Sequence, residues 1–352
     1  MAWAPLLDGD LRARATSTIE EIARALDREA PDASLGRGSS GVALLFGYLD
    51  PGGPEAERHF DRALAATAAA ATPPSLHRGF VGVGWVGTHL GLLDPDDDEL
   101  DQAITASLGD WGELDLMNGL AGLLVHVRER LPRPGASETA LRIVEALAAR
   151  LDTWAGPRSL LGVAHGIAGI ASAMIHAGAG ARARQVTMTA LERALVRLPE
   201  LARVPVFGWC HADIGFGAAL LAMARTLGDL TLEQTAVAIA RDAAGRHRHA
   251  EVVRDASFCH GAAGLGHLFN RIYQATGDPS CADAARHWFA RALELRTDRG
   301  IGGYRAWIAA TGKELDWHDE VGVVHGAAGV ALALLAATSD REPAWDRAFA
   351  LS

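Results

Sequence analysis

Residues 259–269 read CHGAAGLGHLF, a stretch in which a cysteine and a histidine stand directly before a Gly-x-x-Gly step and an apolar run. The glycines of the step are Gly261 and Gly264. Glycine has no Cβ, so it lets the backbone turn sharply and lets neighbouring helix starts approach closely. A step of this kind that recurs at regular spacing indicates a repeat architecture.

The step does recur, seven times along the 352 residues. A small or polar lead-in precedes each copy, and an apolar, helix-like run follows it. Successive copies are 40 to 49 residues apart, with 65 residues before the last, and only the fifth copy replaces its first glycine by alanine. The first positions of the seven steps are Gly38, Gly79, Gly119, Gly166, Ala212, Gly261 and Gly326.

Each interval also contains a second, more charged stretch with apolar residues at helical spacing, such as ETALRIVEALAARLDTWA from Glu138. The repeat is therefore a helix pair, in which the apolar helix is buried and the amphipathic one faces solvent. Almost no segment alternates as a strand does. An open solenoid needs polar capping repeats, but the terminal copies here are as apolar as the others. We predict one all-α domain over residues 1–352, a closed double-layered ring (an α/α toroid) of seven helix pairs.

The composition narrows the functional classes. A formal net charge of -10 disfavours sequence-independent binding to the phosphates of nucleic acid, so we expect no nucleic-acid partner. The first residues lack the pattern of a signal peptide, and no apolar run reaches the length of a membrane span. Three cysteines, an odd number, do not suggest a disulfide framework. These features predict a reducing, cytoplasmic setting, where clustered Cys and His more often bind metal or catalyse.

In a closed ring the copies GWCHADIG and SFCHGAAG are neighbours, so Cys210 lies near Cys259 and His260. Two thiolates and an imidazole are suitable ligands for a tetrahedral zinc ion that keeps one position open. The alternative is that the two thiols are small buried hydrophobic groups. The third cysteine, Cys281, does not lie in a segment that precedes a Gly-x-x-Gly step, and it is interpreted as structural.

The segments GVAHGIAG, GWCHADIG and SFCHGAAG, in this order, and the C-terminal sequence resemble the lanthionine synthetase C-like family, the zinc-dependent cyclases of lanthipeptide biosynthesis. The resemblance covers essentially the whole chain. It implies an α/α toroid with zinc (Zn2+) bound by Cys210, Cys259 and His260. It also implies an activity, the addition of a cysteine to a dehydroalanine or dehydrobutyrine of the same precursor peptide. The implied partner is a dehydrated precursor peptide with its leader, and a dehydratase is a second candidate partner whose stable association the sequence leaves open.

Such an addition leaves an enolate that must be protonated, so an acid–base group is needed near the metal. The resemblance assigns this place to His165 in AHGIAG and implicates Asp115, four residues before its step. Without the resemblance, His165 is a hydrogen-bonded core histidine and Asp115 a helix cap. Asp115 can also act by orienting His165.

The chain departs from the family pattern in places. The common Trp-Cys-Tyr-Gly appears as residues 209–212, WCHA, so His211 is either a merely substituted contact or a mouth residue that alters substrate choice. The arginine that often precedes this motif has its nearest counterpart in Arg203, and His325 is a candidate alternative ligand or wall residue. The stretch RGIGGYRAWIAATGKELDWHDE, from Arg299, resembles a loop near the central opening, or marks an ordinary turn.

Three other functions stay open at this point. A cyclase-like protein could use the same site to add glutathione or another small thiol to dehydroamino acids. A non-catalytic toroid could bind peptides and hold a structural zinc with four protein ligands, which His211 or His325 would complete. An α/α-barrel glycosidase would need paired carboxylates across the cleft, whereas the repeat mouths carry thiols and imidazoles.

Overall fold

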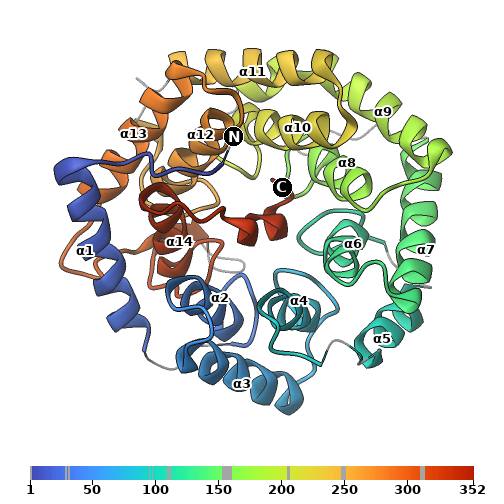
Figure 1. The fold of residues 1–352 in the computed structure, drawn as a ribbon, viewed down its shortest axis with the longest axis horizontal. Coiled ribbons are helices and arrows are strands. Elements are labelled where there is room, and N and C mark those ends of the chain that lie inside the picture. Colours follow the sequence, from blue (N-terminus) through green and yellow to red (C-terminus); the bar gives the residue numbers. More distant parts are fainter. Residues whose placement is uncertain are drawn as a thin grey trace.

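The computed structural model describes residues 2–27, 30, 32–94, 96, 98–108, 112–152, 161–203, 207–246, 251–309 and 314–352. Their α-helices form two concentric rings, with the apolar helices inside and the amphipathic helices outside (Figure 1). The predicted all-α double-layered toroid of seven helix pairs is therefore confirmed. No helix in the described ranges is both long and apolar enough to cross a membrane.

The inner ring consists of the helices that follow the Gly-x-x-Gly steps. Each contacts the next along the chain, and the last contacts the first, so the ring closes. Nearly all residues of these helices are buried, as expected for helices that are apolar all round. They are α2 (Ser39–Leu49), α4 (Phe80–Leu90), α6 (Leu120–Glu129), α8 (Ile167–His176), α10 (Asp213–Leu227), α12 (Ala262–Thr276) and α14 (Ala327–Thr338).

The outer ring carries the charged faces. Its first helix, α1, packs against α14, so the N-terminal helix completes the pair that the last repeat begins. This closure joins segments more than 300 residues apart, as the contact of Trp3 with the Ala336 carbonyl also shows. The outer helices are α1 (Gly9–Leu26), α3 (Pro54–Ala69), α5 (Glu99–Ser107), α7 (Pro134–Leu151), α9 (Ala181–Val196), α11 (Leu230–Gly245) and α13 (Pro279–Glu294).

The first position of every step is the N-cap of an inner helix, and its backbone is extended. Any residue adopts such a backbone, which is consistent with alanine at position 212, where φ is -98°. Crowding is a separate reason for glycine, because the chain passes too close to hold a side chain at the second position of the step and also at first positions such as Gly79. A Cβ on Gly82 would lie 1.9 Å from the Leu76 carbonyl oxygen, and one on Gly264 would lie 1.9 Å from that of Phe258.

This close approach predicts a specific stability effect. Gly82→Ala should destabilise the fold by about 1–3 kcal/mol, because the backbone must shift to admit the methyl group. Gly245→Ala is the matched control, since a Cβ there meets nothing within 4 Å. It should leave the thermal unfolding midpoint unchanged or slightly raised. Equal midpoints for the two variants would show that the step glycines are not required by packing.

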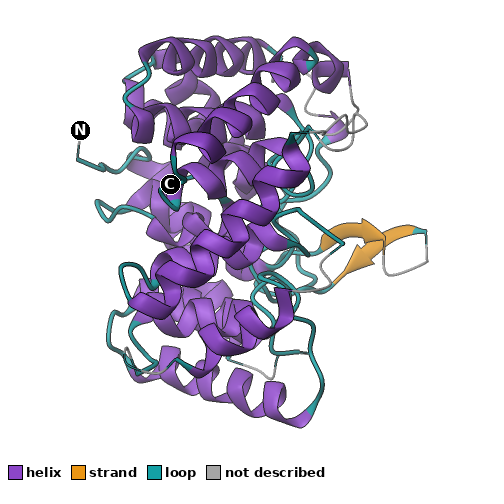
Figure 2. Cartoon of the chain, turned by 90° about the vertical axis from the view of Figure 1, so that its right-hand side faces the viewer, coloured by secondary structure: helices purple, strands orange, loops and turns teal. Residues whose placement is uncertain are grey.

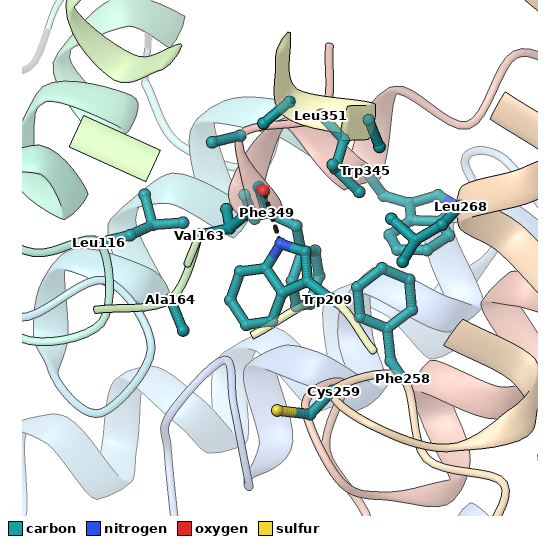
Figure 3. Packing of buried hydrophobic residues seen from close by; sticks show 14 of the residues in the cluster. Leu116, Val163, Ala164, Trp209, Phe258, Cys259, Leu268, Trp345, Phe349 and Leu351 are labelled. Atoms are coloured by element: carbon teal, nitrogen blue, oxygen red, sulfur yellow. Dashed lines mark hydrogen bonds between the residues drawn. The ribbon is translucent and has the colours of Figure 1, made fainter. Parts of the chain in front are cut away.

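The C-terminal segment fills the centre of the ring (Figure 1). Its short helix η5 (Ala344–Phe349) is buried, and its carbonyl groups accept hydrogen bonds from the inner repeats. The Trp209 indole donates to the Phe349 carbonyl at 2.9 Å, and the rings of Trp209 and Phe258 pack on the Phe349 ring (Figure 3). The residues directly before both candidate thiol ligands therefore rest on this segment.

The structure contains a β-hairpin that the sequence pattern did not predict. Strand β1 (Ala306–Ala309) pairs antiparallel with β2 (Leu315–His318), and the hairpin projects from the ring on the side away from the C-terminus (Figure 2). Its four-residue strands are too short to show a clear alternation. Trp307 lies opposite Trp317 with ring centroids 5.2 Å apart, and such a cross-strand pair stabilises a short hairpin. Gly302 and Gly303, both with positive φ, form the turn that leads into it.

Candidate active site

The segments that precede the inner helices, here called lead-ins, meet around the ring axis. The residue two positions before the N-cap lies at the same height in neighbouring lead-ins. Backbone hydrogen bonds join these residues from one repeat to the next. The side chains that follow are thereby fixed at one level of the ring. The bonds run from the amide of Gly36 to the carbonyl of His77 (2.9 Å), Ala164 to Cys210 (3.3 Å), Cys210 to Cys259 (3.4 Å), Cys259 to Val324 (2.9 Å) and Val324 to Gly36 (3.2 Å).

The lead-ins surround a cavity of about 960 Å³, here called the central cavity. The β-hairpin forms a further wall of it, through Trp307, Ile308 and Leu315. The cavity thus combines an imidazole-rich and thiol-containing floor with an apolar wall. The side chains directly before the N-caps that line it are Arg37, Arg78, His165, His211, His260 and His325.

Cys210, Cys259 and His260 form a compact thiol–imidazole cluster in this cavity. Their ligand atoms all lie within 4.8 Å of one another. Both cysteines are buried, and the His260 side chain is 29% exposed. Two sulfurs and one imidazole nitrogen at this separation can hold one ion at bond lengths of about 2.0–2.3 Å, so the donor set fits zinc.

Hydrogen bonds within the cluster favour one thiolate. A bond from the Cys259 thiol, with further ones from His211 and His260, holds the pKa of Cys210 well below its usual range despite burial. The same contact with Cys210, together with burial, raises the pKa of Cys259. These opposite directions favour a state in which the two sulfurs share one proton. A divalent cation that binds both sulfurs must displace this proton, so its binding depends on pH.

Asp255 lies beside His260 and holds the turn that precedes Cys259, a role that was not predicted from the sequence. One carboxylate oxygen accepts from the Ser257 amide and hydroxyl, at 3.0 and 2.8 Å. The other accepts from the Trp307 amide at 2.7 Å and lies 3.8 Å from Nε2 of His260. A signal was present, because the same Asp-Ala-Ser triplet occurs at the first repeat, where Asp32 bonds Ser34 in the same way.

His165 and Asp115 form a hydrogen-bonded pair on the cavity wall. Nδ1 of His165 lies 2.8 Å from Oδ2 of Asp115, whose Oδ1 accepts from the Asn118 amide at 2.7 Å. Burial favours a higher pKa for Asp115, but the bonds from His165 and Asn118 outweigh it and hold that pKa below its ordinary value. The carboxylate is therefore ionised. It fixes Nδ1 as the bonded nitrogen of His165 and leaves Nε2 for the cavity, where the side chain is 33% exposed.

The sequence also named His211, His325 and Arg203 as candidates for contacts with the substrate or the metal, and the three differ in position. His211 lines the cavity, with its ring 5.7 Å from that of His165, and its hydrogen bond to Cys210 raises its pKa. His325 lies with its ring 5.4 Å from that of His260, and burial lowers its pKa to about 3, so it is neutral. Arg203 ends the short helix η3 (Leu198–Arg203), but its side chain lies outside the described residues.

Cys281 stands apart from this chemistry. It lies in α13, fully buried, and burial together with Asp278 raises the pKa of its thiol to about 12. A thiol in this state is neither a nucleophile nor a metal ligand at neutral pH. We expect Cys281→Ala to retain the wild-type zinc content in elemental analysis. A fall in zinc per folded chain would show that this cysteine takes part in the metal site.

The closed ring of helix pairs and the thiol–imidazole cluster that faces its central cavity define a helical toroid with a donor set that suits a metal ion. The chain belongs to the lanthionine synthetase C-like family, because the profile described as "Lanthionine synthetase C-like protein" matches residues 29–350. Among solved structures it is similar to nisin cyclase, with a TM-score of 0.70 and 14% sequence identity over 98% of each chain. At this identity the likeness shows the shared toroid fold.

A sugar epimerase from a ruminal bacterium superposes with a TM-score of 0.46 and 12% identity, over 91% of this chain and 98% of that chain. No curated protein matches the sequence.

Proposed function

We propose that the protein is a lanthipeptide cyclase that joins cysteine thiols of a dehydrated precursor peptide to its dehydroalanine or dehydrobutyrine residues. The observation that carries the proposal is that the thiol–imidazole cluster and the Asp115–His165 pair open onto the same cavity. One group suits activation of a thiol and the other suits proton transfer. Family membership supports the same reaction.

Cys210, Cys259 and His260 would hold the zinc ion, with Asp255 orienting His260. Three protein ligands leave a fourth position for the substrate. Zinc bound there would favour the deprotonated, nucleophilic form of a substrate thiol whose ordinary pKa is about 8.5. His325 is neutral and its ring lies tilted beside that of His260, and we assign it to the cavity wall.

His165 would complete the reaction as the proton donor. A carbon–sulfur bond forms at the β-carbon while the electron pair of the double bond moves toward the carbonyl group. The resulting enolate takes a proton at its α-carbon from Nε2 of His165, and Asp115 stabilises the positive charge that His165 carries before transfer. The proton gained by carbon equals the proton lost by sulfur, so the peptide mass does not change.

We also propose the setting in which this chemistry occurs. The substrate would be a precursor peptide with its leader, made reactive by a separate dehydratase. All three cysteines are free thiols, which is consistent with a reducing cytoplasm. We infer that the chain works as one domain, because its first outer helix completes the last helix pair.

A competition experiment tests this function. The zinc-loaded protein is given a dehydrated, cysteine-containing peptide together with glutathione at neutral pH. We expect free thiols of the peptide to disappear at constant mass, faster than without enzyme. A mass increase by one glutathione would instead support the small-thiol alternative. Peptide binding with neither change would support a toroid without catalysis.

A further inference from the structure

One wall of the central cavity takes no part in the chemistry proposed above. It is formed by the β-hairpin through Trp307, Ile308 and Leu315, with Val252 at its edge. Leu315 is 57% exposed and Val252 is 49% exposed. Large apolar side chains exposed together beside a cavity are typical of a binding surface rather than of a solvated loop.

The hairpin is hydrogen-bonded to the turn that carries Cys259 and His260. The Trp307 amide donates to Asp255, which also holds the turn at Ser257 and lies beside His260. The Trp307–Trp317 pair stiffens the hairpin itself. A side chain bound on this wall is therefore held at a defined place relative to the reacting atoms.

Positive charge accompanies the apolar wall. The guanidinium of Arg254 lies 5.2 Å from the centre of the Trp307 ring, and Arg78 lines the cavity from the second repeat. Neither arginine forms an ion pair with any carboxylate in the described part of the chain, whereas Arg37 is paired with Glu320. Two unpaired cations on a protein of net charge -10 favour a ligand with negative charge at this mouth.

We infer that the hairpin wall binds a substrate segment in which an apolar or aromatic residue stands next to an acidic one. The apolar side chain packs on Leu315, Trp307 and Val252. The carboxylate meets Arg254, which is stacked on the same wall. This inference rests on the proposed function and adds a preference for the sequence that flanks the reacting residues.

The test separates binding from reaction by using peptides that cannot react. Labelled peptides of about eight residues, without cysteine or dehydrated residues, carry a central Leu-Glu, Leu-Lys, Ser-Glu or Ser-Lys pair. Binding to the full-length zinc-loaded protein is measured by fluorescence anisotropy at low and high salt. We expect the Leu-Glu peptide to bind best, and we expect its advantage over Leu-Lys to shrink as salt screens the charges.

Two exposed substitutions test the two halves of the surface. Leu315→Asp should weaken the Leu-Glu peptide about tenfold, which corresponds to about 1.4 kcal/mol. Arg254→Glu should reverse the preference, so that Leu-Lys binds better than Leu-Glu. Leu141→Asp on α7 is the control for Leu315, since Leu141 is 58% exposed on the outer ring, and Arg193→Glu on α9 is the control for Arg254.

Equal affinities for all four peptides, or equal losses with the control variants, would overturn the inference. These outcomes leave the cyclase function untouched, because no peptide in the set can form a ring. Conversely, a protein that binds Leu-Glu peptides selectively but never consumes thiols would retain this binding surface and lose the proposed function. The two failures are therefore distinguishable.

Discussion

Replacing Cys210 by alanine is expected to abolish tight zinc binding. Cys259 and His260 would be the only remaining members of the thiol–imidazole cluster, and two ligands cannot build the usual tetrahedral site. The substitution also removes the sulfur whose hydrogen bonds tie Cys259, His211 and His260 together. Zinc per folded chain, measured by elemental analysis after dialysis against a weak chelator, should fall from about one to near zero.

Two controls separate this loss from misfolding. Cys281→Ala removes a buried thiol of the same chain and should keep its zinc. The far-ultraviolet circular dichroism of Cys210→Ala should remain helical, because the ring is held by the packing of its inner helices rather than by this site. Zinc content equal to wild type in a folded Cys210→Ala protein would contradict the assignment of the metal site.

His165→Ala is expected to keep both zinc and fold but to lose cyclisation by about 10²–10⁴-fold. The side chain is one-third exposed on the cavity wall, so its removal leaves no large void in the core. The cluster can still present the nucleophile, but no positioned group delivers the proton to the α-carbon. The rate is measured near neutrality against a reaction without enzyme, since thiols add to dehydroamino acids unaided at high pH.

Asp115→Asn tests which part of the proton transfer depends on Asp115 and which on His165. If Asp115 acts by holding His165, the double variant should be little slower than either single variant, because residues that act as a unit are not additive. Multiplicative losses would assign Asp115 an independent step. Cyclisation by zinc-loaded His165→Ala at the wild-type rate would show that His165 is only a wall residue.

The fold could be predicted because the repeat appears repeatedly in the sequence. The glycines of the steps recur for one physical reason: the backbone passes too close to leave room for a Cβ, as at Gly82 and Gly264. Closure of the ring was predicted from apolar terminal repeats. The partner of α14 was not, because the pairing of α1 with α14 joins the two ends of the chain and no local pattern encodes it.

Only part of the candidate site could be predicted from the sequence. The spacing of one repeat predicts that Cys210 lies beside Cys259, and the structure brings these two thiols and the Asp115–His165 pair to one cavity. The supporting residues were missed because their roles depend on long-range contacts. Asp255 becomes relevant through a hydrogen bond to Trp307, 52 residues away, and Phe349 through packing under Trp209.

The most direct test of the account is a zinc titration of metal-free protein, followed by the rate of thiol loss from a dehydrated precursor peptide at neutral pH. We predict that the chelated protein is inactive, that the rate rises in proportion to added zinc and that it stops rising at about one zinc per chain. Free thiols should disappear while the peptide mass stays constant. Full activity of the metal-free protein, at the rate of the zinc-loaded one, would contradict a cyclase built on Cys210, Cys259 and His260.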